Sequence, residues 1–512
     1  MATAMVTELE RRVPAGVGSG TAASRGGPGP KSDDAALPRD KSVFGSTDAY
    51  IGKKDELAQK AMIVAVLVAF QLLLLIQKLT GLGPLFSAMP VFLFLIAVEF
   101  VIQRLSQYHS VGAGYTVAGL ICSVSAGVIQ QIGGVLVKKA VITFGLMPYE
   151  YLFEKFGAPL GGHNTQLVLA LVFQDLGYYW AHRCYHQVQL GWMFHAIHHN
   201  NDHYNFAVAL RQSWGNNMTS WVFYLPLALF INPEALRWAA EWNLIYQYWV
   251  HTCLVRRTPA WFEYVFSTPS HHRVHHDRRL HKNFGGLFII WDRMFGTFLS
   301  EVKLAEGVRG GGDLTRLDDG EEVSVFGTML NQENYLVDLF QLQHPIQTAR
   351  SLYKAKGLRQ KLKVALEGAG FYSAVHKDRG IMPRASVPLN RRIRFSSRLP
   401  IPGSLYTLVH FHVAVALFIL VSVDPGVLNQ SFLGVCSSYM PVVACLCSLA
   451  VINDGTRIAP YTETLRCFWI AAASKQDGGP VFYFFALSGL IALFNPEWLQ
   501  ATKVVSRPKK DI

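Results

Sequence analysis

Long runs of apolar residues constrain this chain more than any other feature. One run extends from about Met62 to Leu79 and a second from about Met89 to Ile102, and others cover roughly residues 404–422 and 433–452. A helix of about 20 apolar residues spans a bilayer, and a membrane accepts only segments that satisfy their own backbone hydrogen bonds. With weaker apolar segments elsewhere in the chain, the sequence predicts an all-α, polytopic integral membrane bundle of about seven to nine spans.

Composition supports a membrane protein and argues against a nucleic-acid partner. Of the 512 residues, 51% are hydrophobic and 16% are charged, and the mean hydropathy is +0.22. The net charge of +12 is accompanied by no nucleic-acid motif, whereas membrane proteins concentrate Lys and Arg in cytoplasmic loops and beside anionic lipids. The seven cysteines lie mostly in apolar segments and form no disulfide-like pattern. We therefore expect membrane lipids, and no nucleic acid, as partners.

The order of the segments predicts a division into five parts. These are a disordered tail at 1–45, a membrane-embedded catalytic domain at 46–300, a cytosolic basic linker at 301–400, C-terminal transmembrane helices at 401–500 and a cytosolic tail at 501–512. Within the catalytic domain, residues 112–147 are interrupted by Lys138-Lys139 and predict one helix followed by a shorter interfacial piece. Lys509-Lys510 resembles a dilysine retrieval signal, which favours a multi-pass protein of the endoplasmic-reticulum membrane.

Histidines gather with the spacing of metal ligands. Twelve of the 18 fall between His182 and His281, mostly in the clusters His182-Arg-Cys-Tyr-His186, His195-Ala-Ile-His198-His199 and His271-His272-Arg-Val-His275-His276. Helical residues three or four apart share a face, and neutral imidazole is the commonest metal ligand in proteins. In the second and third clusters the adjacent pair can reach two neighbouring ions. Eight or nine converging imidazoles therefore predict a site for two metals, which we expect to face the cytosol.

Nine histidines are the expected ligands: His182, His186, His195, His198, His199, His251, His272, His275 and His276. His271 is either a ligand or a neighbour of His272, and His203 and His281 are expected to be peripheral. Asp175, seven residues before His182, is expected to orient the ring of His182, because acids behind a metal site often hold the free ring nitrogen of a ligand. A hydrogen bond from Asp175 to a neighbouring helix is the alternative.

The number of imidazoles favours iron over zinc. Imidazole suits zinc, copper, iron and nickel, but a zinc hydrolase normally takes three protein ligands and one water. Iron, unlike zinc, binds and reduces dioxygen. A di-iron site beside lipid therefore predicts O2-dependent oxidation of an unactivated C–H bond in an acyl, alkyl or sterol chain. A zinc transporter or a zinc hydrolase is the alternative from another class.

The three histidine boxes, HxxxH, HxxHH and HxxHH, resemble those of the membrane-bound fatty acid hydroxylase superfamily. Segments such as Asp175-Leu-Gly-Tyr-Tyr-Trp180 and Trp291-Asp-Arg-Met-Phe-Gly-Thr297 are similar to the alkylglycerol monooxygenase family within it. The resemblance implies an endoplasmic-reticulum enzyme that uses two iron ions, O2 and tetrahydrobiopterin. Such an enzyme hydroxylates the ether-linked carbon of O-alkylglycerols and releases a fatty aldehyde and a glycerol derivative. It also implies that the box histidines carry the metals.

One position departs from that family. Its animal members have Glu directly after the second histidine of the first box, a residue linked to pterin use, and this chain has Gln187. Gln keeps the shape of Glu but loses the charge. Gln187 is therefore the candidate pterin-binding position, and Asp175 and Gln187 are the candidate catalytic residues beside the metal ligands. The alternative is a sterol or fatty-acyl hydroxylase or desaturase of the same superfamily, which acts on another long-chain substrate with cytochrome b5 as electron donor.

Overall fold

The computed structural model describes residues 53–106, 114–143, 148–201, 203–277, 280–301, 326–328, 335–366, 394–475 and 479–506. The expected N-terminal tail at 1–45 and the dilysine pair Lys509-Lys510 lie outside these residues. The all-α prediction is confirmed. One addition within the described residues is a two-stranded antiparallel sheet, in which β1 (Arg394–Arg398) pairs with β2 (Thr502–Ser506), so that Arg394 faces Ser506.

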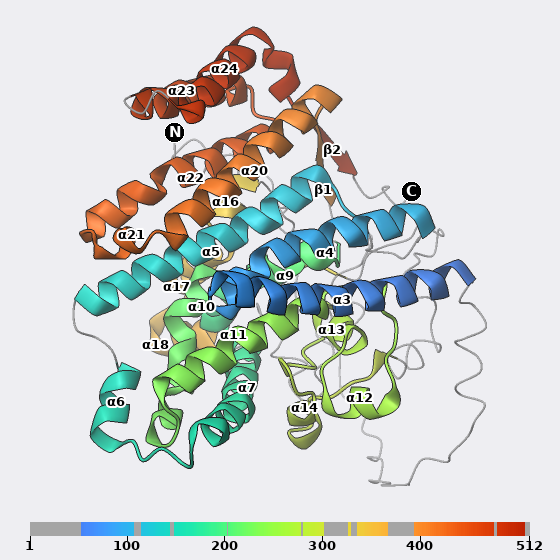
Figure 1. Ribbon diagram of the computed structural model, residues 1–512, viewed down its shortest axis with the longest axis vertical. Coiled ribbons are helices and arrows are strands. Elements are labelled where there is room, and N and C mark those ends of the chain that lie inside the picture. Colours follow the sequence, from blue (N-terminus) through green and yellow to red (C-terminus); the bar gives the residue numbers. More distant parts are fainter. Residues whose placement is uncertain are drawn as a thin grey trace. The chain divides into compact units, whose positions relative to one another are not determined.

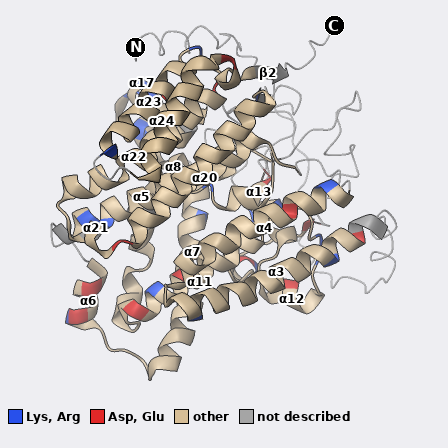
Figure 2. Cartoon of the chain, turned by 45° about the horizontal axis from the view of Figure 1, so that its top comes forward, with Lys and Arg blue, Asp and Glu red and all other residues tan. Residues whose placement is uncertain are grey.

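Five helices in the described ranges are long and apolar enough to cross a membrane. They are α3 (Lys53–Thr80), α4 (Pro84–Ser106), α5 (Val117–Thr143), α20 (Ile401–Val423) and α22 (Phe432–Asn453). Figure 2 shows few charged residues along α4, α5 and α20. The chain is therefore a multi-pass membrane protein, because helices of this length and composition match the thickness of a bilayer.

The described residues contain five candidate spans, which is fewer than the seven to nine expected from the sequence. The helix α7 (His163–Gln187) is 25 residues long, but it includes Gln, Asp, His and Arg side chains. The helices α23 (Ala459–Ala473) and α24 (Pro480–Phe494) have 15 residues each, and 15 residues rise only about 22 Å in a helix. The helices α7, α23 and α24 are therefore too short or too polar to be among the five candidates, and the total number of spans stays a prediction.

The expected break at Lys138-Lys139 is wrong. The helix α5 continues through both lysines to Thr143, and the short helix α6 (Pro148–Phe156) follows as a separate element. No proline interrupts α5, and a lysine near a helix end can extend its amine toward water while its methylenes stay against apolar neighbours. Charge alone does not end a helix here.

The long helices pack in two hydrophobic groups. The helix α3 packs on α4, and α20 packs on α22, with α5 in contact with both α20 and α22 (Figure 1). Gly127 allows α5 to approach the chain after α9 (Phe206–Ala209) closely, since a Cβ at Gly127 would lie 2.3 Å from the Leu210 carbonyl oxygen. The close approach joins the long helices to the elements that carry the histidines.

The histidine-bearing elements are α7, α8 (Gln189–His199) and α13 (Pro269–His276), together with the end of α11 (Pro233–Trp249). The helix α7 packs on both α8 and α11, and α11 packs on α4. The apolar segment at residues 219–231 forms two 3₁₀ helices, η1 (Ser220–Phe223) and η2 (Leu225–Leu229). The helices of the site thus rest against the first membrane spans.

The remaining elements are short. They are α9 (Phe206–Ala209), α10 (Trp214–Thr219), α12 (Ala260–Val265), α14 (Ile290–Met294), α16 (Tyr335–Leu339), α17 (Gln343–Lys354), α18 (Gly357–Leu366), α21 (Pro425–Asn429) and η5 (Pro496–Leu499). In the predicted basic linker, α16 packs on α5 and α22, whereas α17 and α18 pack on α8. The division of the chain into five parts stays a prediction.

Candidate metal centre

The structure brings all nine expected ligands together in two groups. The first group contains five histidines and the second contains four, and within each group the ring nitrogens that could bind a metal all lie within 4.8 Å of one another. The first group is His182, His186, His195, His199 and His275, and the second is His198, His251, His272 and His276. Two groups of this kind can hold two metal ions.

Helical geometry explains how the groups are divided. His182 and His186 lie one turn apart on α7 and both belong to the first group. On α8 the neighbours His198 and His199 belong to different groups, because successive helical residues point about 100° apart. The pair His275 and His276 on α13 divides in the same way. Each adjacent pair therefore spans the two groups.

Backbone carbonyls fix the protonation of two rings. The Nδ1 of His182 lies 2.8 Å from the Phe284 carbonyl oxygen, and the Nδ1 of His251 lies 2.8 Å from the Gln247 carbonyl oxygen. A carbonyl oxygen can only accept, so each Nδ1 carries the hydrogen and, in a neutral ring, Nε2 keeps a bare lone pair. The Nε2 of His251 lies 2.9 Å from the Nε2 of His272. Each group thus contains a lone pair directed at other imidazoles.

Burial keeps these rings neutral. Each of the nine is at most 4% exposed. Desolvation lowers the pKa of His182 to about 4, although the hydrogen bond to Phe284 opposes the shift, and it lowers the pKa of His251 to about 3. For His186, burial and the neighbouring imidazoles, His275 and His199 first among them, lower the pKa well below its ordinary value. Neutral imidazole is the form that binds metal.

Unsatisfied nitrogens show that the residues fit a bound cation. Both ring nitrogens of His186 are buried without a hydrogen-bond partner, and so is the Nε2 of His275, whose Nδ1 bonds the Lys282 carbonyl oxygen at 3.0 Å. Buried polar atoms are usually hydrogen-bonded, so a buried nitrogen without a partner is unusual, and a bound ion would account for it. All donors in both groups are imidazole nitrogens. The set therefore suits a transition metal that prefers nitrogen.

Asp175 does not bond His182, so its expected direct role is wrong in this structure. Seven residues are about 10 Å along a helix axis, which puts the carboxylate out of reach of that ring. Asp175 instead accepts hydrogen bonds from the backbone N–H groups of Leu287 and Phe288 and from Trp291 Nε1, at 2.7, 2.9 and 2.9 Å. The alternative in the sequence, a bond to a neighbouring helix, is also present, since Asn243 Nδ2 on α11 donates at 2.7 Å.

These contacts connect Asp175 to the site through the 284–291 loop. The loop supplies the Phe284 carbonyl that orients His182. Gly286 lets the loop reach Asp175, because a Cβ at Gly286 would lie 2.8 Å from Asp175 Oδ1 and 2.7 Å from Asn243 Oδ1. Asp175 is thus linked to the candidate ligand His182 through this loop and not by a direct bond.

Asp292 holds the same loop from its other side and was missed in the sequence. Its carboxylate accepts from the N–H groups of Phe284 and Gly285, at 2.8 and 2.7 Å, and from the Thr297 hydroxyl at 2.6 Å. Burial raises the pKa of Asp292 to about 6, against the effect of these hydrogen bonds. The signal was present, because the segment Trp291–Thr297 already resembled the family.

Two further charged residues brace the region around His251. Glu99 on α4 accepts from the Thr252 hydroxyl at 2.5 Å and from the Phe206 N–H at 2.9 Å. Arg273 on α13 donates to the Thr252 carbonyl at 3.1 Å and pairs with Glu301 at 2.8 Å. Glu99 is a lone acid in an apolar span, and such a residue is a signal for a specific role.

Gln187 lies at the end of α7 with its side chain exposed. Its Oε1 accepts from Arg183 Nε at 3.2 Å, and the residue belongs to neither histidine group. Gln187 can therefore contact only a molecule that approaches this exposed end of the helix.

Two other histidines near the site lie outside both groups. The ring of His281 lies 5.7 Å from that of His186, so His281 is peripheral to the first group, and His271 belongs to neither group.

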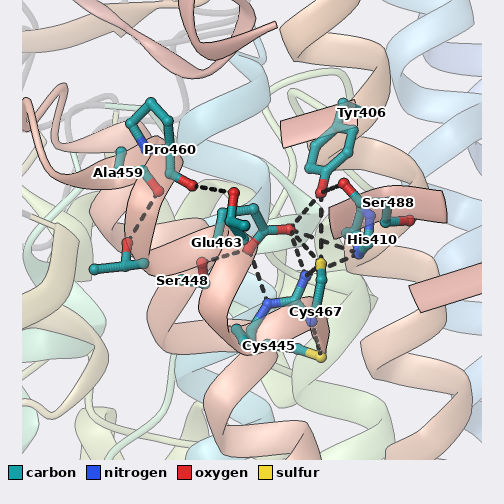
Figure 3. A network of polar contacts seen from close by, with 12 residues as sticks. Tyr406, His410, Cys445, Ser448, Ala459, Pro460, Glu463, Cys467 and Ser488 are labelled. Carbon is teal, nitrogen blue, oxygen red and sulfur yellow. Dashed lines mark hydrogen bonds and ion pairs between the residues drawn. The ribbon is translucent and has the colours of Figure 1, made fainter. Parts of the chain in front are cut away.

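A third cluster, in the C-terminal helices, is unsuited to a metal. His410, Glu463 and Cys467 lie close enough to hold an ion and, with Cys445, face one another in Figure 3. However, the Arg466 guanidinium already donates to Glu463 Oε2 at 2.8 Å, to Cys445 Sγ at 2.9 Å and to His410 Nδ1 at 3.1 Å. The guanidinium is thus the cation of this cluster.

Comparisons with known proteins agree with this geometry. The fatty acid hydroxylase family matches residues 167–297, which contain all nine histidines. Alkylglycerol monooxygenase of Homo sapiens is 30% identical over 390 residues, which cover 74% of this chain and 80% of that protein. The protein of the same name from Danio rerio is 30% identical over 396 residues, 75% of this chain and 80% of that protein.

A more distant relative is the ornithine lipid hydroxylase OlsE of Rhizobium tropici, 31% identical over 144 residues, 26% of this chain and 41% of that protein. No solved structure matches the chain. The likeness to the first relatives extends over most of both chains, well beyond the histidine boxes. The chain therefore belongs to the alkylglycerol monooxygenase family and is a membrane-bound oxygenase of the fatty acid hydroxylase type.

Proposed function

We propose that this protein is a di-iron monooxygenase of the endoplasmic-reticulum membrane that cleaves O-alkylglycerols. It hydroxylates the ether-linked carbon with O2 and tetrahydrobiopterin, and the hydroxylated product collapses to a fatty aldehyde and a glycerol derivative. The observation that carries the proposal is the pair of buried all-histidine groups in a member of this family. Ether lipids are a substrate that such an enzyme meets within the membrane itself.

The donor set favours iron within this family. Two groups of five and four imidazoles exceed the three protein ligands of a typical catalytic zinc. Iron bound by these histidines would supply the redox chemistry that activates O2 for insertion into a C–H bond. The protein contributes fixed ring orientations, because the Phe284 and Gln247 carbonyls hold His182 and His251. It also excludes water, because the nine rings are at most 4% exposed.

Aromatic side chains close around the histidines. The ring of Trp192 lies 5.2 Å from that of His186 and 5.6 Å from that of His199, and the ring of Tyr204 lies 5.7 Å from that of His251. These rings present an apolar wall to an alkyl chain. The carbon beside the ether oxygen is the favoured target because the oxygen lone pairs stabilise a radical or cation at that carbon.

One residue keeps a second candidate function open. Gln187 lacks the negative charge of the Glu that the family resemblance implies at this position. The missing charge favours a hydroxylase or desaturase acting on sterols or fatty acyl chains with electrons from cytochrome b5. The proposed site is otherwise the same. The two candidates differ in electron donor and substrate, so one experiment separates them.

The test uses the purified full chain in lipid nanodiscs. Metal analysis should give two iron ions, one for each histidine group, and alkylglycerol should yield fatty aldehyde only with both O2 and tetrahydrobiopterin. His198→Ala should abolish turnover. His412→Ala, a change at an exposed histidine that belongs to neither group, should leave turnover unchanged. Bound zinc without oxygen consumption would refute the proposal, and turnover with cytochrome b5 alone would select the second candidate.

A further inference from the structure

The helices α17 and α18 expose apolar side chains that no other element covers within the described residues. On and just before α17, Leu342, Ile346 and Tyr353 are 40%, 44% and 89% exposed. The three lie on one side of the helix, because successive residues turn by about 100°. Single exposed apolar residues are ordinary, but a row on one face indicates a surface that meets something apolar.

The helix α18 repeats the pattern more strongly. Leu358, Leu362 and Leu366 are spaced four residues apart, so they form one stripe, and they are 74%, 49% and 56% exposed. Arg359 and Lys361 lie on the two sides of this stripe. An apolar stripe flanked by basic residues is typical of a helix that lies in the plane of a membrane interface.

The charge of the segment has a single sign. Residues 342–366 contain no Asp or Glu, and their six basic residues are Arg350, Lys354, Lys356, Arg359, Lys361 and Lys363. Basic segments beside a membrane are attracted to anionic lipid headgroups, whose potential falls off within a Debye length. The charge of α17 and α18 is therefore complementary to an anionic leaflet.

The opposite face of α17 is attached to the metal centre. His344 and Thr348 are buried on that face, and Gln189 Nε2 at the start of α8 donates to the Thr348 hydroxyl at 2.8 Å. The ring of His344 lies 6.4 Å from that of Trp192, which itself contacts His186. These contacts fix which side of α17 faces outward.

We propose that α17 and α18 form an interfacial anchor that lies on the anionic lipid leaflet, with the leucine stripe among the headgroups. The membrane is the occupant that the structure favours, because the segment belongs to a chain with five candidate spans and precedes the span α20. An acidic protein partner is the competing occupant. The anchor sets the distance of the helix α8, and so of its three histidines, from the lipid surface.

The test is hydrogen–deuterium exchange with mass spectrometry on the full chain in two nanodiscs. One contains phosphatidylcholine alone, and the other also contains phosphatidylglycerol. Backbone amides of 343–366 should exchange more slowly in the anionic nanodisc, and added salt should remove the difference because it screens the charges. Exchange in the span α22 should be the same in both lipids and serves as the internal control.

Two sets of substitutions separate charge from apolar contact. Replacing Lys356, Arg359 and Lys361 with Gln should reduce the lipid-dependent protection by about fivefold for each base removed. Leu358→Gln with Leu362→Gln should raise exchange in both lipids, and Lys155→Gln, at an exposed base on α6, should change nothing. Equal exchange of residues 343–366 of the unchanged chain in both lipids would refute the proposal. Slower exchange that appears only when an acidic protein is added would show that the surface binds such a protein instead of the membrane.

Discussion

Replacing Asp175 with asparagine tests whether the 284–291 loop positions the metal ligands. The carboxylate accepts four hydrogen bonds, two on each oxygen. Asparagine keeps one oxygen and turns an NH2 group toward two donors, either Asn243 and Leu287 or Phe288 and Trp291. A buried donor without an acceptor costs about 1–3 kcal/mol, so the change should destabilise the loop by about 2–6 kcal/mol.

Such a loss is large enough to move the Phe284 carbonyl away from His182. A carbonyl or carboxylate that orients a metal-binding histidine typically contributes 10- to 100-fold to metal affinity or activity. We therefore expect Asp175→Asn to lose iron about 10- to 100-fold more readily to a chelator. The matched control is Asp424→Asn, because the exposed carboxylate of Asp424 caps the short helix α21 by accepting a hydrogen bond from the Gly426 N–H.

The assay is iron retained by purified protein during a chelator titration, with thermal stability in detergent measured in parallel. If Asp175→Asn resists the chelator and heat as the unchanged chain does, the loop has no positioning role. If Asp175→Asn does not fold, Gly286→Ala serves as the second probe. The added methyl group would press on Asp175 and Asn243 but would leave both acceptors in place. Normal metal retention in Gly286→Ala would also refute the reasoning.

Three other substitutions test separate parts of the structure. Arg466→Met leaves the buried carboxylate of Glu463 unpaired and should destabilise the fold by about 3–5 kcal/mol, whereas the double variant with Glu463→Gln should recover most of that loss in thermal denaturation. His251→Ala removes one of four ligands in the second group and should reduce bound metal toward one ion per chain by elemental analysis, while His412→Ala keeps both. Gln187→Glu introduces the charge that the family resemblance implies at this position and should lower the KM for tetrahydrobiopterin about fivefold with kcat unchanged, since charged hydrogen bonds exceed neutral ones by about 1 kcal/mol.

The grouping of the histidines could be predicted because it depends on local geometry. Residues three or four apart share a helical face, and adjacent residues such as His198 and His199 must diverge. The spacing alone therefore indicates two neighbouring metals. His251 was harder, since its place in the second group depends on where the chain after α11 meets His272 on α13, but its position after an apolar helix still marked it.

The residues behind the ligands could not be predicted in the same way. Asp175 meets Leu287 more than 100 positions later in the chain, and nothing in a single sequence indicates which loop will return to a given carboxylate. The same limit hid the contact of Glu99 with Thr252. A lone acid in an apolar segment indicates that a bonding partner exists, because burying a carboxylate without a partner is costly. The sequence does not indicate which residue that partner is.

The two histidine groups also imply that metal binding and folding are linked. The groups hold five and four desolvated imidazoles, and inside each group the ring nitrogens lie within 4.8 Å of one another. Hydrogen bonds cannot satisfy all of these nitrogens, since both nitrogens of His186 have no partner. Protonation would relieve the lone pairs only by creating buried positive charges, and burial opposes this, as the lowered pKa of His182, about 4, indicates. A divalent cation in each group would satisfy the nitrogens without that penalty, so bound metals would contribute free energy to the native packing of α7, α8 and α13. Metal loss should therefore loosen these helices first, while the distant cluster around Arg466, which contains its own cation, keeps the C-terminal helices together.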